Sequence, residues 1–392
     1  MILRPLSERV DWLGGIDWEA RLFDALVPLP DGTSYNAYVV RGSEKTVLID
    51  SVDTHFESNL MAALDGVGRI DTVVSNHAEQ DHSGAIPAVL ARFPEAEVVC
   101  SIKAKRMLVD LLGIAPERIR TVKDGEEMSL GDRTLRFVYT PWVHWPETMS
   151  TLLVEERMLF SCDLFGSHLA TSDLFARFDG PLMEAAKRYY AEIMMPFRSH
   201  VSDNIRKLAP LDIDVIAPSH GPVHDKPAVI VDAYRDWADA APKNRVVVAY
   251  VSMHNSTRRM VDLLVDACIA RGVGVDRFDL TATDSGKLAM SLVDSATLVL
   301  ASPVVLEGPH PLAVGAAYLA NVLKPKLRYL AALGSFSWSP KALNKLQGML
   351  ADLDAEWLPP VSGRGLPGAE VVKAIDGLAE TIATRHRENG WT

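Results

Sequence analysis

Four side chains of the kinds that bind metal ions lie in one short segment, directly after an apolar run. The run is residues 72–74, and the segment that follows it carries His77, Glu79, Asp81 and His82. A ligand cluster just past a strand lies on a loop at the edge of a sheet, where side chains can converge on one point. The first half of the chain is therefore constrained to a fold whose strand ends meet around a metal site.

Three further residues of ligand type occupy comparable positions. Each of them follows a short apolar run: they are His144, Asp163 and His220. The runs alternate with turn signals, and this mixture of hairpins and crossovers predicts an α+β sandwich of two sheets with helices outside. A helix is expected over 102–112, and strands over 38–40, 46–49, 72–74, 97–100, 135–139, 151–154, 158–161 and 215–217.

The pattern changes near residue 240. The segment 240–244 has the composition of a linker, so we expect a boundary at 242, with one domain over 1–242 and a second over 243–392. In the second domain strands and helices alternate, which predicts a doubly wound parallel α/β sheet. The expected strands are 245–251, 275–280, 296–301 and 328–333, and the expected helices are 256–271, 285–293, 311–323 and 341–350.

Composition excludes several classes of function. The 392 residues include 40 basic and 51 acidic side chains, a net charge of −11, which argues against nucleic-acid binding. The three cysteines are scattered and form no CxxC pair, so we expect buried thiols rather than disulfides or a zinc ribbon. The N-terminus has no signal-peptide pattern, and no apolar run approaches the ~20 residues of a membrane helix. We therefore expect a cytoplasmic protein without a membrane partner.

The order of the seven ligand-type residues resembles the ligand set of flavodiiron proteins, in which a metallo-β-lactamase-like domain precedes a flavodoxin-like domain. The segments 33–36, 144–147 and 219–221 also look like signatures of that family. Hydrolases of the fold usually have histidine at the position of Glu79, and a carboxylate there favours iron over zinc. The resemblance implies one iron on His77, Glu79 and His144, a second on Asp81, His82 and His220, and Asp163 as the bridge.

No catalytic residue is expected beyond these ligands. The other histidines are interpreted as structural or surface residues: His55, His168, His200, His224, His254, His310 and His386.

Three segments of the second domain are candidates for flavin binding. They follow predicted strands, where doubly wound sheets bind ligands, and the first opens into a helix that could bind a phosphate. This half resembles flavodoxin, which implies FMN, although Val304-Val305-Leu306 stands where the family usually has polar groups. Trp338 could stack on the flavin ring. The candidate FMN residues are Ser252, Met253, His254, Asn255, Ser256, Thr257, Ser302, Pro303, Gly334, Ser335, Phe336 and Trp338.

The resemblance implies an oxidoreductase that reduces O2 to water, NO to N2O, or both, at a di-iron site supplied by FMN. It also implies a head-to-tail homodimer or tetramer in which the flavin of one subunit serves the irons of its partner. Without a rubredoxin module in the chain, the electron donor is expected to be rubredoxin, a flavin reductase or a reduced cofactor. Two alternatives remain open: a zinc hydrolase with a flavin-free second domain, and a redox or gas sensor.

Overall fold

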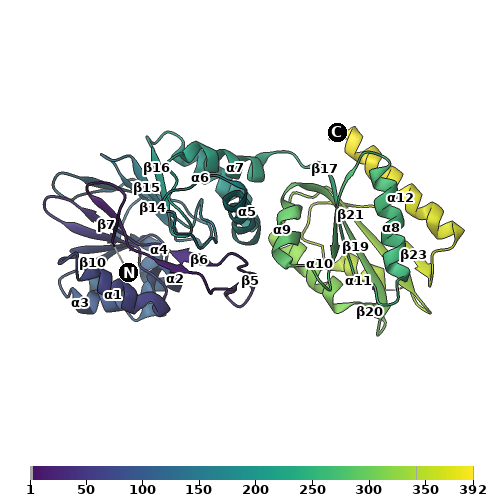
Figure 1. Cartoon of the computed structure of the whole chain (residues 1–392), viewed down its shortest axis with the longest axis horizontal. Coiled ribbons are helices and arrows are strands. Elements are labelled where there is room, and N and C mark those ends of the chain that lie inside the picture. The colour runs from purple at the N-terminus through teal and green to yellow at the C-terminus, as the bar shows by residue number, and fades with distance from the viewer. Residues whose placement is uncertain (1–2, 341, 392) are drawn as a thin grey trace. The chain divides into compact units, whose positions relative to one another are not determined.

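The computed structural model describes residues 3–340 and 342–391 and divides the chain into two compact units, Met1–Ala238 and Asp239–Thr392. Helix α7 (Pro227–Asp239) ends the first unit, and strand β17 (Lys243–Tyr250) begins the sheet of the second; the expected boundary at residue 242 lies between them (Figure 1). Among the described residues, no helix is long and apolar enough to cross a membrane.

The first unit is a sandwich of two sheets, as the sequence predicted (Figure 1). One sheet has the order β1 (Arg4–Pro5), β2 (Val10–Trp12), β7 (Tyr38–Arg41), β8 (Thr46–Ile49), β9 (Thr72–Ser75), β10 (Glu97–Ser101) and β11 (Ile119–Val122). The other has the order β12 (Glu127–Ser129), β13 (Thr134–Tyr139), β14 (Met149–Leu153), β15 (Met158–Cys162) and β16 (Val215–Pro218).

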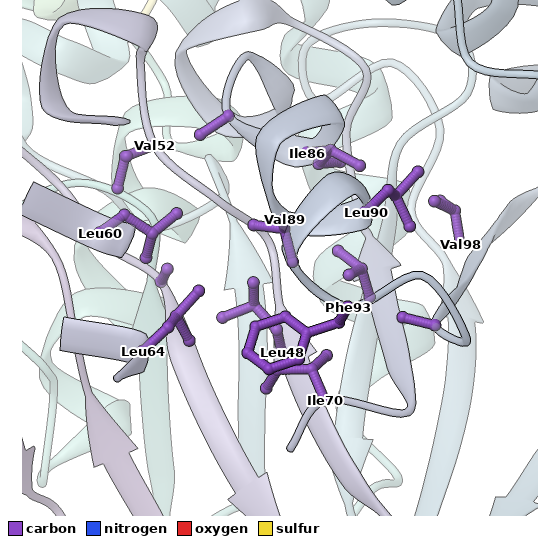
Figure 2. Close-up of a cluster of buried hydrophobic side chains, with 14 of the residues drawn as sticks. Leu48, Val52, Leu60, Leu64, Ile70, Ile86, Val89, Leu90, Phe93 and Val98 are labelled. Carbon is purple, nitrogen blue, oxygen red and sulfur yellow. The ribbon is translucent and has the colours of Figure 1, made fainter. Parts of the chain in front are cut away.

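Alternating side chains of the central strands build the two layers of the core. Val47 and Val74 face the second sheet, where they pack in one cluster with Phe137. Leu48 and Val73 point to the opposite face, because successive residues of a strand alternate in direction. Figure 2 shows this outer cluster, in which helix side chains such as Leu60 and Val89 meet the sheet. The helices that contribute to it are α1 (Glu57–Leu64), α3 (Ile86–Arg92) and α4 (Ile102–Leu112).

Several further elements of the first unit were not predicted from the sequence. Two short hairpins precede the first sheet's central strands, and one short helix follows β9. These elements are β3 (Gly15–Asp17) paired with β6 (Thr33–Tyr35), β4 (Leu22–Phe23) paired with β5 (Val27–Pro28), α2 (Gln80–Ser83), α5 (Gly180–Tyr189) and α6 (Arg198–Leu208).

The second unit is a doubly wound parallel sheet, which confirms the prediction. Its order is β18 (Gly274–Asp279), β17, β19 (Ser295–Val305), β21 (Tyr329–Phe336), with β22 (Glu356–Trp357) and β23 (Val361–Arg364) beside β21. This is the flavodoxin-like strand order. The strands are parallel, but the order in which the chain adds them to the sheet reverses between β17 and β19. Helices α8 (Ser256–Ile269) and α12 (Ala369–Glu388) cover one face; α9 (Ser285–Asp294), α10 (Pro311–Leu323) and α11 (Ala342–Gly348) cover the other (Figure 1).

Two of the three candidate flavin segments begin as strand rather than after it. Strand β19 continues to Val305 and folds back on β20 (Gly308–Pro309), with Leu306 and Glu307 at positive φ in the turn. The β-branched pair Val304-Val305 suits this extended pairing. Strand β21, expected to end at residue 333, likewise continues to Phe336, and its last residues pair with β23. Lys341, expected to begin a helix, lies outside the described residues.

Candidate metal centre and flavin loops

The strand ends of the first unit carry the candidate ligands to one edge of the sandwich. His77 follows β9, whereas Asp81 and His82 lie on α2, the short helix just beyond it. Asp163 directly follows β15, and His220 lies two residues beyond the end of β16. These two strands are adjacent and parallel, so both residues lie at the same edge of the sheet. The structure thus brings together residues that are far apart in the chain.

One group of ligand atoms consists of His77, Glu79 and His144. The Nε2 atoms of His77 and His144 each lie 3.0 Å from Oε2 of Glu79. The same two Nε2 atoms lie 3.5 and 3.4 Å from Oδ2 of Asp163. These four side chains therefore converge on one point.

The second group consists of Asp81, His82 and His220. The Nε2 atoms of both histidines lie 3.2 Å from Oδ2 of Asp81. They lie 3.0 and 3.4 Å from Oδ1 of Asp163, which is the other oxygen of that carboxylate. Asp163 stands between the groups and presents one oxygen to each.

The unpaired carboxylate oxygens of this site fit metal ions. Both oxygens of Asp81 and Oδ2 of Asp163 are buried and accept no hydrogen bond from the described residues. A buried carboxylate without a partner is unfavourable, and a bound cation removes that cost. Imidazole nitrogens and carboxylate oxygens together suit a transition metal such as iron, so the donor set fits two such ions.

Electrostatics also favour cations at the histidine Nε2 atoms. Burial lowers the pKa of His82, but Asp81 and Asp163 outweigh burial and raise it to about 9. For His144, Asp163 and Glu79 likewise overcome burial and raise its pKa to about 9. The carboxylates thus attract positive charge to these nitrogens, and a metal that binds there displaces protons.

Two of the histidines are oriented from behind by hydrogen bonds. Nδ1 of His77 donates to Oε1 of Glu147 at 2.6 Å, and the amide of Ala78 donates to the same oxygen at 3.1 Å. Nδ1 of His220 donates to the carbonyl of Ser34 at 2.7 Å. Each of these bonds turns Nε2 toward the centre, as supporting groups commonly do in metal sites.

Comparisons with known proteins agree with this geometry. Residues 33–221 match a family model described as "ODP family beta lactamase". The chain is 33% identical to the "Nitric oxide reductase" of Moorella thermoacetica, over 97% of this chain and 98% of that protein. It is 35% identical to the type A flavoprotein of Rhodobacter capsulatus, over 90% of this chain and 87% of that one. The chain belongs to the flavodiiron family.

Solved structures of flavodiiron proteins have the same architecture as this chain. The rubredoxin oxygen:oxidoreductase of Desulfovibrio gigas superposes with a TM-score of 0.94 at 28% identity, covering 98% of this chain and 99% of that one. The flavodiiron protein of Giardia intestinalis gives a TM-score of 0.89 at 26% identity, covering 98% of this chain and 96% of that one. The predicted metallo-β-lactamase-like and flavodoxin-like folds are thereby confirmed.

The segment 33–36 holds the His220 loop of this flavodiiron chain in place. Nδ2 of Asn36 donates to the carbonyls of Pro218 and Gly221, both at 2.8 Å, and the amide of Gly221 donates to Oγ of Ser34. Gly221 has φ +80°, and a Cβ atom there would lie 2.1 Å from Oγ of Ser167. The loop therefore needs glycine at this position both for its backbone and for space.

Several residues beside the metal groups were not singled out from the sequence. The hydroxyl of Tyr189 donates to Oδ1 of Asp163 at 2.9 Å. Asp24, on the β4–β5 hairpin, lies near Glu79, and burial together with the carboxylates of Glu79 and Asp81 raises the pKa of Asp24. The ring of His168 lies 4.9 Å from that of His220. Tyr189 follows no strand, and the hairpin has no periodic pattern that indicates its place.

The cysteines are all buried and free, as expected. Cys162 precedes Asp163, and burial raises the pKa of its thiol well above its ordinary value. The thiol is therefore neutral at physiological pH, and a neutral thiol is a poor metal ligand.

The three candidate flavin segments adjoin where the strand order reverses. Oγ1 of Thr257 lies 2.8 Å from Oγ of Ser335, and Ser302 is in register with Gly334. Asn255 precedes α8 with φ 65° and makes no side-chain cap hydrogen bond. The amides of the first helical turn are thus uncapped by this residue, and such a helix N-terminus suits a phosphate.

Not every expected hydroxyl is free for a phosphate. Thr257 is buried against Ser335, and Oγ of Ser252 accepts from the amide of Arg258 at 3.1 Å. Oγ of Ser302 donates to the carbonyl of Pro303 at 2.8 Å and accepts from the amide of His310 at 2.9 Å. The Ser252 hydroxyl and the amides of the first turn of α8 other than that of Arg258 therefore remain as donors for a phosphate.

Proposed function

We propose that this flavodiiron chain reduces O2 to water, NO to N2O, or both, at a pair of irons bound by its seven predicted ligands. The observation that carries the proposal is the position of Asp163, whose two oxygens face two separate ligand groups. When bound, the two irons and FMN supply the electrons for the reduction. The chain's own residues bury the site and fix the direction of each ligand nitrogen.

The donor set supports iron rather than zinc. Glu79, Asp81 and Asp163 supply carboxylate oxygens beside the four histidines, and this oxygen-rich set suits iron better than the histidine-rich set of the related zinc hydrolases. Membership of the flavodiiron family also argues against the two alternative functions, a zinc hydrolase and a redox or gas sensor.

The proposed substrates rest on what the relatives' names state. The Moorella thermoacetica relative is named a nitric oxide reductase, and the Desulfovibrio gigas structure a rubredoxin oxygen:oxidoreductase. A relative from Methanothermobacter marburgensis, 35% identical over 79% of this chain, is named a coenzyme F420H2 oxidase. These names differ in substrate and in electron donor. We accordingly propose that a separate protein or reduced cofactor supplies the electrons.

We place FMN at the reversal of strand order in the second unit, with its phosphate at the N-terminus of α8. Near the loops that follow β17, β19 and β21, apolar side chains are open to solvent: Met253 is 50% exposed, Leu306 95% and Trp338 71%. On the β4–β5 hairpin beside the metal groups, Leu26 is 73% exposed. Exposed apolar groups at both sites support a head-to-tail dimer in which each flavin meets the partner's irons.

Metal and flavin analysis of the purified protein tests this proposal, followed by anaerobic titration with O2 and with NO. We expect about two irons and one FMN per chain, as the family implies. Replacing Asp163 with alanine removes the shared carboxylate, so iron content and turnover should both collapse. Asp203→Ala changes a solvent-exposed aspartate on α6 and serves as the control. Full iron content and full activity in Asp163→Ala would refute the bridging role.

A further inference from the structure

His168 is buried beside the metal groups but belongs to neither of them. It is 3% exposed, and its ring lies 4.8 Å from the ring of Tyr189 and 4.9 Å from that of His220. On another side it meets Phe23 of the β4–β5 hairpin, at 5.2 Å between ring centroids. The imidazole therefore helps to form the wall of the site next to the second ligand group.

Among the described residues, only Nδ1 of the His168 ring has a hydrogen-bond partner. Nδ1 lies 2.9 Å from Oγ1 of Thr33, which is fully buried. Nε2 is buried and has no partner within the described part of the chain. A neutral imidazole has one donor and one acceptor nitrogen, so when the Thr33 hydroxyl donates to Nδ1 the proton lies on Nε2.

Another buried histidine of this chain shows what a purely structural role looks like. His386 is 1% exposed, its Nε2 lies 2.7 Å from Oγ1 of Thr297, and its Nδ1 lies 2.9 Å from Oδ1 of Asn244. Both of its ring nitrogens are satisfied by the protein, as is usual for buried polar groups. An unpaired nitrogen alone does not indicate a ligand, because Nδ1 of buried His224 also has no partner among the described residues. What distinguishes His168 is that its ring lies beside those of His220 and Tyr189, at the metal groups.

We propose that Nε2 of His168 donates a hydrogen bond to the oxygen of the diatomic substrate at the metal centre. The aromatic rings of Phe23 and Tyr189 contact the imidazole, and Thr33 at Nδ1 leaves Nε2 open to another partner. His168 is then a substrate-binding residue. It belongs to neither metal group, and the spacing of the ligands in the sequence does not predict its role. This inference rests on the proposed function, because it requires O2 or NO at the site.

The test compares His168→Leu with His168→Gln, since glutamine can return an N–H donor near the position of Nε2. Iron and FMN contents are measured first, and then the KM for NO, the kcat and the N–O stretching frequency of NO bound to the reduced protein. In His168→Leu we expect normal iron content, a shifted stretching frequency and a KM raised roughly threefold to tenfold, the range of one lost hydrogen bond. His168→Gln should recover part of both changes.

The control is His224→Gln. His224 is also buried, and its Nδ1 has no hydrogen-bond partner in the described part of the chain. Its ring stacks on Phe178, and its Nε2 donates to the carbonyl of Phe165. This variant should leave the stretching frequency and KM unchanged. An unaltered frequency and KM in iron-replete His168→Leu would overturn the inference about His168. Absence of iron from the unmodified protein would instead overturn the proposed function.

Discussion

Replacing Glu147 with glutamine tests how much the support behind a ligand contributes to metal binding. The carboxylate of Glu147 is fully buried, and its Oε1 accepts from both Nδ1 of His77 and the amide of Ala78. Oε2 has no hydrogen-bond partner among the described residues. Glutamine keeps the shape and one acceptor oxygen, but it removes the charge and places an unpaired amide N–H pair where Oε2 was.

Two losses follow from that geometry. Without the charge, His77 becomes a weaker ligand, and loss of such a supporting group lowers metal affinity by about 10- to 100-fold, or about 1.4–2.7 kcal/mol. The unpaired buried amide should destabilise the fold by a further ~1–3 kcal/mol. The first loss appears in metal affinity, and the second in the unfolding free energy of the metal-free protein.

Competition with a chelator of known affinity measures the metal loss, and urea unfolding of the metal-free protein measures the other. Glu127→Gln is the matched control, because Glu127 lies in β12, is 47% exposed and pairs with Arg136. If Glu147→Gln held metal as tightly as Glu127→Gln, the argument that this carboxylate orients and strengthens His77 would be wrong.

Three other substitutions probe separate features. Gly221→Ala should cost more than the roughly 1–2 kcal/mol of a positive φ and should lower iron content, because its Cβ would meet Ser167; Gly272→Ala, with φ +75° and open space around it, isolates the backbone cost in urea unfolding. Burial lowers the pKa of His224 from 6.5 to about 4, so its contribution to stability is present above pH 6.5 and is lost as the pH falls toward 4. Between pH 6.5 and 4, the unfolding free energy of His224→Gln should therefore fall by up to about 3 kcal/mol less than that of the unmodified protein, as measured by urea unfolding. Equal slopes of unfolding free energy against pH for the two proteins would contradict this. Leu306→Asn should raise the thermal midpoint slightly, since asparagine tolerates the left-handed backbone of this exposed turn better than leucine.

Sequence patterns predicted the parts of the fold that repeat locally. The strand at 46–49 and the helix at 102–112 were placed with their observed bounds, because apolar periodicity and turn residues mark such elements. The long helix α12 was not predicted, even though it is amphipathic. Seven of its residues are acidic or basic, and its apolar face packs on the sheet. The extension of β19 was missed because Ser302-Pro303 looks like a loop when its parallel partner β21 is unknown.

The candidate ligands could be found from sequence because each follows a strand, but their supporting groups could not. Glu147 lies 70 residues from His77, and Ser34 lies 186 residues from His220. No local pattern encodes such a pairing, which depends on how the sheets stack. The same holds for His168. From the sequence it was interpreted as a structural or surface residue, and only the tertiary structure places it beside His220.

His82 shows that the ligands are not all held in the same way. Its Nδ1 is buried and has no hydrogen-bond partner within the described residues, unlike Nδ1 of His77 and His220. Its backbone is fixed instead, since its carbonyl accepts from both the amide and the hydroxyl of Ser51, at 2.7 and 2.8 Å. Backbone anchoring places the ring but does not set its rotation or its proton. The orientation of His82 therefore depends on its contacts with Asp81 and Asp163 and on any ion between them. We expect this candidate ligand to be more sensitive to metal occupancy than His77 or His220.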